Sequence, residues 1–232
     1  MSTTRGARER ARTEVTAAIK EEARRQLAAD GAAKLSLRAV ARELGMVSSA
    51  LYRYFPSRDD LLTALITDAY DAVGEAAEAA LANAPADADH LARWLAVCMS
   101  VRRWALGHPH EYALIYGSPV PGYSAPQTTA EPAARVALAL VSVARDAHRS
   151  RGLALVRIPG ALRPEAERLA GDVAPDLPPE TAVAFAAVWA QLFGLISFEV
   201  FGHYHRVVED RDAFFAHAAG ELARAVGVLT QS

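Results

Sequence analysis

The stretch Glu43–Phe55, ELGMVSSALYRYF, decides how the rest of the chain is interpreted. A glycine ends one short helical pattern, and a run of small residues begins another that closes on Tyr-Arg-Tyr-Phe. A core helix of this length would carry Leu or Ile where the two tyrosines and the arginine stand. The second pattern is therefore expected to expose a polar face to a partner.

Composition favours helix and excludes several classes of protein. Apolar residues make up 52% of the 232, which is too many for a disordered chain, and alanine is frequent while β-branched residues rarely alternate with polar ones. The single cysteine, Cys98, excludes an internal disulfide and a multi-cysteine zinc site. No signal-peptide pattern opens the chain and no uninterrupted apolar run approaches the roughly 18 residues of a membrane span. A cytoplasmic protein without a membrane partner is expected.

Charge is distributed unevenly along the chain. Residues 1–58 hold 12 Lys and Arg against 6 Asp and Glu, whereas the remaining residues hold 13 against 21. A basic N-terminal quarter on an acidic body suggests a small anion-binding domain joined to a larger module. The alternative is a chance fluctuation in solvated charge.

Helical periodicity covers the first third of the chain. The predicted helices occupy about residues 9–30, 36–44, 47–54 and 58–82. Ser36 and Ser57 can cap the second and fourth of these helices, and Gly45 ends the second.

Helices are also predicted beyond residue 82. They run from Asp87 or Asp89 to Gly107, directly after His108-Pro109, over 129–151 and, as a short helix, over 163–170. The prolines and glycines of Gly117–Pro126 predict an irregular loop, and the rest of 152–179 is expected to be a mobile connection.

The last two predicted helices, about 180–205 and 210–229, differ from the others. The first is apolar nearly all round, so it must be covered on every side, and a second copy of the chain is the simplest cover. The second offers a continuous apolar seam made of Phe214, Ala218, Leu222, Ala225 and Val226.

Helix, glycine-containing turn and helix together form the layout of a helix-turn-helix motif, whose second helix enters the major groove of DNA. Leu51 and Phe55 supply an inward anchor at i and i+4. The residues before and between them are small, or end in donors that can reach phosphates.

The segment SLRAVARELGMVSSALYRYFPSRDDLLTAL resembles the DNA-binding segment of the tetracycline-repressor (TetR) family of transcriptional regulators. The resemblance covers about residues 12–65, and its landmarks are Ser36, Ala41, Leu44-Gly45, Leu51-Tyr52, Tyr54-Phe55, Arg58 and Leu61-Leu62. One position departs from the family pattern. Val47 stands where the family usually has a capping serine, so Ser48 is expected to take over the cap.

The resemblance implies two sets of DNA contacts. The base-reading positions are Arg38, Ser48, Ser49, Ala50 and Arg53, and the phosphate positions are Ser36, Tyr52, Tyr54 and Arg58. The alternatives are that Arg38 and Arg53 are ordinary solvated residues and that Tyr52 belongs to the core. The N-terminal arginines, Arg5, Arg8, Arg10 and Arg12, either add contacts to DNA or belong to a disordered tail.

The body resembles the WHG type of TetR-family ligand domain, through Trp104, His108-Pro109, Tyr112 and the Tyr116–Tyr123 loop. A pocket for an apolar or aromatic effector is expected between its helices. The predicted lining residues are Trp94, Cys98, Val101, Trp104, Tyr112, Tyr116, Tyr123, Phe185, Trp189 and Phe193. Glu199 and His148 are candidates for polar contacts. The alternative for each aromatic residue is a filled core.

Other chemistry has little support. The pairs His108/His110 and His203/His205 are spaced poorly for chelation on a helix, so no metal or cofactor is predicted. No catalytic arrangement stands out, so the protein is not expected to be an enzyme.

Together these patterns predict an all-α fold of about nine helices, with a helix-turn-helix domain over 1–57 and a ligand-binding and dimerisation domain over 58–232. The predicted function is that of a ligand-responsive regulator, most simply a repressor, which binds a palindromic operator in double-stranded DNA as a homodimer. The alternatives are an activator of the same family, a helical small-molecule-binding protein that does not bind DNA, and an all-helical enzyme.

Overall fold

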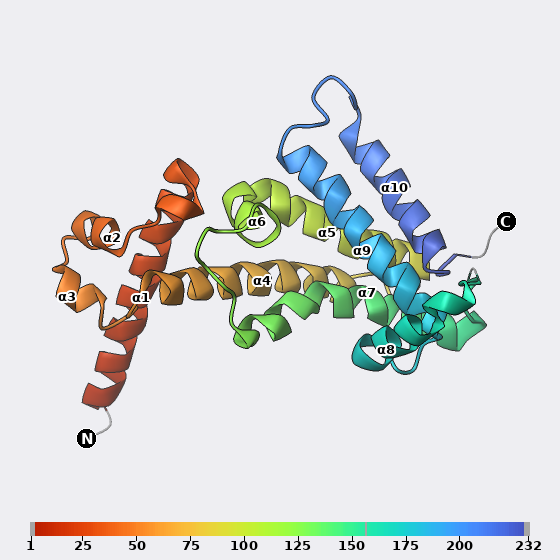
Figure 1. Cartoon of the computed structure of the whole chain (residues 1–232), viewed down its shortest axis with the longest axis horizontal. Helices are drawn as coiled ribbons and strands as arrows, with labels where there is room; N and C mark the ends of the chain where they lie inside the picture. The colour runs from red at the N-terminus through yellow and green to blue at the C-terminus, as the bar shows by residue number, and fades with distance from the viewer. Residues whose placement is uncertain (1–2, 156, 230–232) are drawn as a thin grey trace. The chain divides into compact units, whose positions relative to one another are not determined.

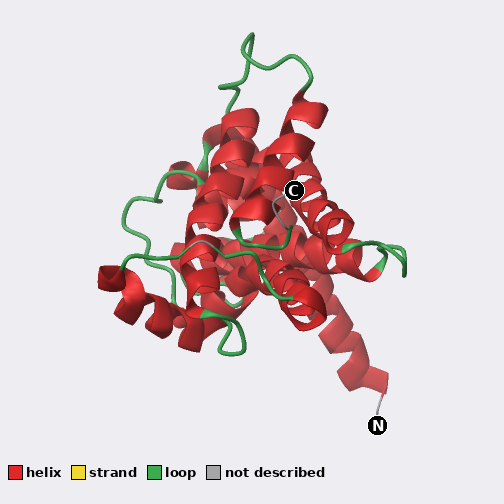
Figure 2. Cartoon of the chain, turned by 90° about the vertical axis from the view of Figure 1, so that its right-hand side faces the viewer, coloured by secondary structure: helices red, strands yellow, loops and turns green. Residues whose placement is uncertain are grey.

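The computed structural model describes residues 3–155 and 157–229, and all regular structure within them is helical (Figures 1 and 2). The α-helices are α1 (Thr3–Asp30), α2 (Leu37–Glu43), α3 (Ser48–Leu51), α4 (Arg58–Ala82), α5 (His90–Gly107), α6 (Pro109–Tyr116), α7 (Ala130–Arg151), α8 (Arg163–Val173), α9 (Pro179–Val200) and α10 (Arg211–Ala225). The predicted all-α class is confirmed, and the short helix in the connection before α9 makes these ten rather than about nine.

The chain divides into two compact units, each of which has its own core. The first contains the described residues up to Tyr70 together with His108–Ala130, and the second contains Asp71–Gly107 and the described residues from Glu131 onward. The continuous helix α4 therefore contributes its first half to unit 1 and the remainder to unit 2. The predicted boundary between residues 57 and 58 divides the chain by function rather than by compactness, and it stays a prediction.

The core of unit 1 joins the first four helices. Its buried side chains are Ile19, Ala23, Leu27, Leu35, Leu37, Val40, Ala41, Leu51, Phe55, Leu61, Leu62 and Leu65. Leu114 of α6 and Val120 and Tyr123 of the following loop pack against the same cluster. The Tyr123 hydroxyl also lies 2.9 Å from the Thr63 hydroxyl of α4, so the proline-rich loop is held on this unit.

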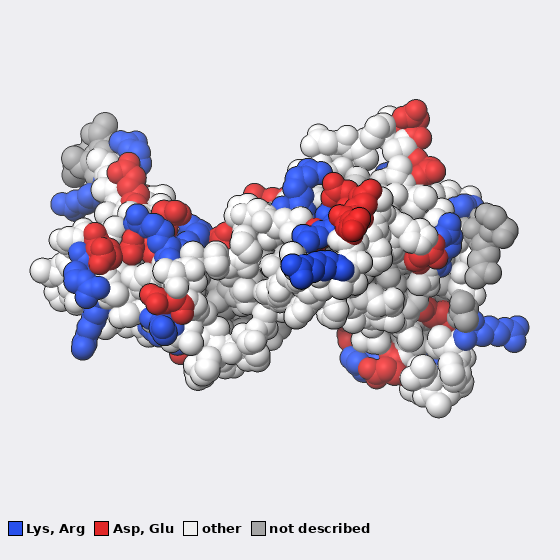
Figure 3. Space-filling view, turned by 90° about the horizontal axis from the view of Figure 1, so that it is seen from above, with Lys and Arg blue, Asp and Glu red and all other residues white. Residues whose placement is uncertain are grey.

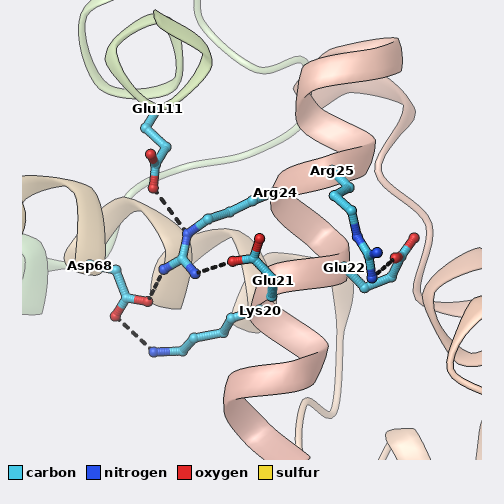
Figure 4. Close-up of polar contacts among 7 residues, drawn as sticks. All are labelled: Lys20, Glu21, Glu22, Arg24, Arg25, Asp68 and Glu111. Carbon is cyan, nitrogen blue, oxygen red and sulfur yellow. Dashed lines mark hydrogen bonds and ion pairs between the residues drawn. The ribbon is translucent and has the colours of Figure 1, made fainter. Parts of the chain in front are cut away.

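An ion-pair cluster ties α1 to α4 and α6 within unit 1 (Figure 4). The Asp68 carboxylate of α4 accepts hydrogen bonds from Lys20 Nζ at 2.7 Å and from Arg24 Nη2 at 2.8 Å. Arg24 Nε donates to Glu111 of α6 at 3.0 Å. These side chains are all less than one-third exposed, so water screens their interactions only in part.

Unit 2 is built around the packing of α5 against α9 and α10. Trp94 is fully buried, its indole Nε1 donates to the Ala219 carbonyl of α10 at 3.0 Å, and its ring meets Phe185 of α9 edge to face at 6.0 Å. Beside these helices, α8 packs along α9.

A buried ion pair joins α5 to α9 in this core. Arg102 Nε and Nη2 donate to the two Glu199 carboxylate oxygens at 2.6 and 2.8 Å, and both side chains are about 95% buried. These hydrogen bonds raise the pKa of the Arg102 guanidinium. Its Nη1 reaches the exposed Asp212 of α10 at 2.7 Å. Glu199, a candidate for effector contact, is thus fully engaged within the core.

A second arginine clamps α4 to α7 in unit 2. Arg135 donates to both carboxylate oxygens of Glu78 at 2.9 and 2.7 Å and to Asp71 Oδ1 at 2.8 Å. Its side chain runs directly over Gly74, where an added Cβ would lie only 2.7 Å from Arg135 Cβ. The absence of a side chain at Gly74 is what lets Arg135 approach α4 this closely.

Several predicted helix limits and faces are corrected by the structure. Helix α1 begins at Thr3 rather than residue 9. Helix α9 ends at Val200 rather than 205, because Gly202 takes φ +80° and the next N–H, of His203, bonds back to the Phe198 carbonyl.

Within the single chain, the last helix buries a stripe beside the predicted apolar seam. Phe215, Ala219 and Ala223 are buried with Leu222 and Val226, whereas Phe214 and Ala225 are exposed and Ala218 is half-buried. The hydrogen bond from Trp94 to Ala219 shows the reason, since α5 packs on the neighbouring stripe of the helix.

Within the described residues, α9 is the one helix long and apolar enough to cross a membrane, with a mean hydropathy of 1.8 over its most apolar window. One such helix is weak evidence for a span, and α9 packs against α5, α8 and α10. Only 33% of that window is buried within this chain, so an apolar face of α9 remains uncovered.

We predict that Glu199→Gln lowers the free energy of unfolding by roughly 3 kcal/mol, because it leaves the Arg102 charge buried with only Asp212 beside it. Urea denaturation at a fixed protein concentration measures the change. Asp212→Asn is the matched control and should cost less than about 1 kcal/mol, since Asp212 is 82% exposed. Equal costs for the two variants would contradict the prediction.

Candidate nucleic-acid interface and internal cavity

The turn after α2 fixes the direction in which the chain enters α3. Gly45 takes φ +64°, a left-handed conformation that suits glycine. Its N–H bonds to the Arg42 carbonyl at 3.1 Å, and the Met46 N–H bonds to the Ala41 carbonyl at 2.8 Å. These two bonds form a Schellman motif at Gly45, the residue predicted to end α2. The motif stops α2 before α3 begins at Ser48.

The start of α3 differs from the prediction. Val47, not Ser48, occupies the N-cap, with extended backbone angles of φ −70° and ψ 138°, and no side chain caps the helix. Ser48 is already the first helical residue, so the expectation that it takes over the cap was wrong. By contrast, Ser36 caps α2 as predicted, because its Oγ accepts from the Ala39 N–H at 3.4 Å.

Burial separates the two faces of α3 and the helical turn that follows it. Leu51 is fully buried and Phe55 nearly so, as predicted for the anchor. Their neighbours Ser48, Ser49, Tyr52 and Arg53 are all exposed, as is Arg38 on α2, while Ala50 is half-buried. Tyr52 is 41% exposed, which excludes the alternative that it belongs to the core. The structure thus brings all five predicted base-reading residues onto two consecutive helical segments.

The predicted phosphate-contacting residues have more varied surroundings. Tyr54 is half-buried, and the Arg12 guanidinium of α1 lies 5.9 Å from its ring centroid, in cation–π contact. Arg8, Arg10 and Arg12 are exposed residues of α1, so they belong to a helix rather than to a disordered tail. The side chain of Arg5 lies outside the described residues.

Arg58 has an internal role that the sequence did not indicate. Its Nε donates to the Leu35 carbonyl at 3.1 Å, and its Nη2 donates to the carbonyls of Ala32 at 2.8 Å and Ala33 at 3.2 Å. The guanidinium therefore fastens the start of α4 to the connection between α1 and α2. Its predicted phosphate contact stays a prediction, and such a contact would compete with these carbonyls.

The aromatic residues predicted to enclose a pocket are instead largely packed together. Trp94, Cys98, Val101 and Trp104 of α5 are buried, and burial raises the pKa of the Cys98 thiol. The ring centroids of Trp189 and Phe193 in unit 2 lie 4.6 Å apart, and those of Tyr112 and Tyr116 in unit 1 lie 5.3 Å apart. Tyr123 belongs to unit 1 as well. Of the ten predicted residues, Phe185 and Trp189 line an apolar cavity in unit 2, whereas the predicted polar contact Glu199 lines a separate, polar hollow beside Arg102.

That cavity has a volume of about 240 Å³ and lies among α7, α8 and α9. Its walls include Val141 of α7, Leu169 and Val173 of α8, and Phe185 and Trp189 of α9. The α8 wall was not predicted, although the i, i+4 spacing of Leu169 and Val173 was a usable signal for an apolar stripe. His148 and Glu199, predicted as polar contacts, are not among the residues that line the cavity.

Among the described residues, no group of three His, Cys, Asp or Glu side chains is placed to hold a metal ion. Of the His-x-His pairs, His108 is the N-cap of α6 and His110 lies within that helix, while His203 and His205 lie in the turn after α9.

Comparison with protein families decides the classification. Residues 19–65 match the model of bacterial regulatory proteins of the tetR family, and residues 94–222, more than half of the chain, match the tetracyclin repressor-like C-terminal domain. The chain belongs to the TetR family. It is therefore a DNA-binding transcriptional regulator with a helix-turn-helix motif, as the resemblance implied. The narrower resemblance to the WHG type stays a prediction.

Relatives of this TetR-family chain support the same assignment. The HTH-type transcriptional regulators Rv1816 of Mycobacterium tuberculosis H37Rv and Mb1846 of Mycobacterium bovis are each 41% identical to it over 219 residues, which is 86% of either chain. The crystal structure of the regulatory protein SCO4313 is 34% identical, with a TM-score of 0.75, and the match covers 92% of this chain and 97% of that one. PfmR of Thermus thermophilus, a TetR-family regulator, is 21% identical with a TM-score of 0.52 over 89% of this chain and 93% of its own, and it shares the fold.

We predict that Val47→Ser stabilises unit 1 by about 1 kcal/mol, because a serine at the N-cap can accept a hydrogen bond from an amide in the first turn of α3. The Val47 side chain is 69% exposed, so little apolar burial is lost. The midpoint of thermal unfolding measures the effect. Val47→Ala is the control, since it removes the same side chain without adding an acceptor, and a serine variant no more stable than the alanine variant would refute the prediction.

Proposed function

We propose that this TetR-family regulator is a cytoplasmic repressor that binds a palindromic operator as a homodimer and is released by a small apolar effector. The observation that carries the proposal is the division of α3 and the turn after it into two faces. Leu51 is buried on one face, and Ser48, Ser49, Tyr52 and Arg53 are exposed on the other. We assign no catalytic reaction to it, because the family consists of regulators.

The exposed residues suit a protein that reads bases and grips phosphates. Arg38 and Arg53 each carry a guanidinium that can form a bidentate pair with guanine or bind a phosphate. Ser48 and Ser49 are small enough to let the backbone of α3 approach base edges closely. Tyr52 is 41% exposed, and a tyrosine hydroxyl can donate to a phosphate oxygen without becoming charged.

The uncovered surface of α9 and α10 supports the homodimer. Ala187 and Ala190 of α9 are exposed, and Phe198 is 53% and Phe214 of α10 37% exposed. The Tyr204 ring lies 5.8 Å from Phe198 and 5.4 Å from Phe214, so these aromatic residues form one exposed cluster. A second copy that packs against the same helices would cover this surface in an isologous four-helix bundle.

Two-fold symmetry then sets the form of the operator. Each copy presents one α3, and two such helices read half-sites about 34–36 Å apart, or a multiple of that distance. An effector that prefers a non-binding state by roughly 5.5 kcal/mol would reduce the binding-competent population from about 99% to 1%.

We predict that Tyr52→Phe weakens binding about tenfold or more across all sequences, because it removes a hydrogen bond from the tyrosine hydroxyl to a charged phosphate, worth at least about 1.5 kcal/mol. Arg38→Ala should relax the preference at one base pair by about 1–3 kcal/mol. If Arg53 reads a base, Arg53→Ala should relax the preference at another base pair. If Arg53 binds a phosphate, the variant should reduce the slope of log affinity against log salt concentration by about 1. Fluorescence anisotropy with duplexes selected from a random pool by the parent protein measures these changes at several salt concentrations.

Arg149→Ala is the matched control for the two arginine variants, because it makes the same change on unit 2. Arg58→Ala is unsuitable as a test of phosphate binding, since it would also release three carbonyls that hold unit 1 together. If the three test variants all bind like the parent, the assignment of α2 and α3 to DNA is wrong.

We predict that Ala190→Arg converts the dimer to a monomer, because it would bury an unpaired charge in the proposed bundle. Sedimentation velocity measures the mass, and operator affinity should fall in the same variant since one half-site contact is lost. Ala79→Arg, at an exposed position of α4, serves as the control and should remain dimeric. An unchanged mass for the Ala190 variant would place the interface elsewhere.

A further inference from the structure

The cavity among α7, α8 and α9 is lined by neutral side chains. Every residue that lines it is alanine, valine, leucine, threonine, phenylalanine or tryptophan. Without an ionisable group in its wall, the cavity cannot compensate the desolvation of a charged ligand. Its occupant should therefore be uncharged and largely apolar.

One polar group in the wall is left without a partner. Thr181, in the first turn of α9, is only 2% exposed, and its Oγ1 makes no hydrogen bond within the described part of the chain. A threonine inside a helix usually bonds to the carbonyl four residues earlier. Here that residue is Leu177, which precedes the helix, and Thr181 Oγ1 makes no bond to its carbonyl.

A buried hydroxyl without a partner is costly in an apolar wall, and native proteins seldom leave one without a reason. A ligand that brings its own hydroxyl or carbonyl group would supply the missing hydrogen bond. Thr181 can serve as donor or acceptor, so either group would suit.

The volume and lining of the cavity also limit the size of the ligand. A cavity of roughly 150 Å³ in an engineered protein core holds benzene. The present cavity, at about 240 Å³, has room for a molecule of two fused rings. Phe185 and Trp189 supply aromatic faces for such rings, and Ala137, Ala174 and Ala182 leave space because their side chains are short.

We propose that this cavity binds an uncharged aromatic molecule of about two rings that carries a single hydroxyl or carbonyl group, hydrogen-bonded to Thr181 Oγ1. The inference rests on the proposed function in that it names the site and chemical class of the effector. It differs from the sequence-based pocket, which centred on α5. Binding to the cavity can be measured without DNA, so the two proposals fail separately.

Equilibrium dialysis of the full chain with 2-naphthol and with naphthalene tests the proposal. The parent protein should bind 2-naphthol about fivefold more tightly than naphthalene, the effect of one net hydrogen bond. Thr181→Val keeps the shape of the side chain but removes the hydroxyl, so the preference should vanish while naphthalene still binds. Because this variant removes an unsatisfied polar group, it should unfold no more readily than the parent.

A second pair of variants tests the location. Ala137→Leu fills the cavity from α7 and should abolish binding of both probes, whereas Ala134→Leu, one turn earlier on α7 and outside the lining, should bind like the parent. The proposal is overturned if the parent binds neither probe, if Thr181→Val keeps the preference for 2-naphthol, or if Ala137→Leu binds as the parent does. Binding that follows the expected pattern but does not release operator DNA would leave the cavity assignment standing and refute its role as the effector site.

Discussion

The burial of Leu51 is the constraint on which the DNA-binding surface depends. Helix α3 is only one turn long, and its hydrogen bonds alone could not hold it in place. The fully buried Leu51 side chain joins it to the cluster formed by α1, α2 and α4. With Leu51 packed inward, the helical periodicity directs Ser48, Ser49 and Tyr52 toward solvent. The reading face is thus a consequence of packing on its opposite side.

The formal charge of unit 1 overstates the number of basic side chains that are free to bind DNA. The N-terminal 58 residues carry an excess of basic side chains, but Arg24 and Lys20 are paired with Asp68, and Arg58 is engaged with backbone carbonyls. Figure 3 shows acidic and basic residues mixed over the visible surface rather than separated. The proposed recognition of DNA therefore rests on a few positioned side chains, those of α2 and α3 among them, more than on net charge.

The sequence predicted the elements well wherever the signal was local, and it predicted the buried faces and the cavity less well. Ser36 and Ser57 cap their helices as expected, because capping involves residues only three apart. Val47 was the exception, since its unfavourable cap is tolerated by a helix held through Leu51. The buried stripe of α10 is set by α5, far away in sequence, and the spacing of Trp94 fits a pocket as well as a core. The space that remains in unit 2 results from small residues and from the position of α8, whose apolar stripe has a local pattern but whose packing partner does not.

The cavity and the clamp on α4 share helix α7, which gives the proposed effector a physical route to the rest of unit 2. Val141 lines the cavity, and Arg135, less than two turns earlier on the same helix, holds Asp71 and Glu78. A rigid helix transmits a small displacement along its length. Because Arg135 packs closely on Gly74, it has little room to move without moving α4. Since α4 is one continuous helix that begins at Arg58, a shift imposed on its second half must be taken up either by the helix itself or by its contacts in unit 1. Those contacts include the ion pairs of Asp68 with Lys20 and Arg24, whose side chains are 23–30% exposed.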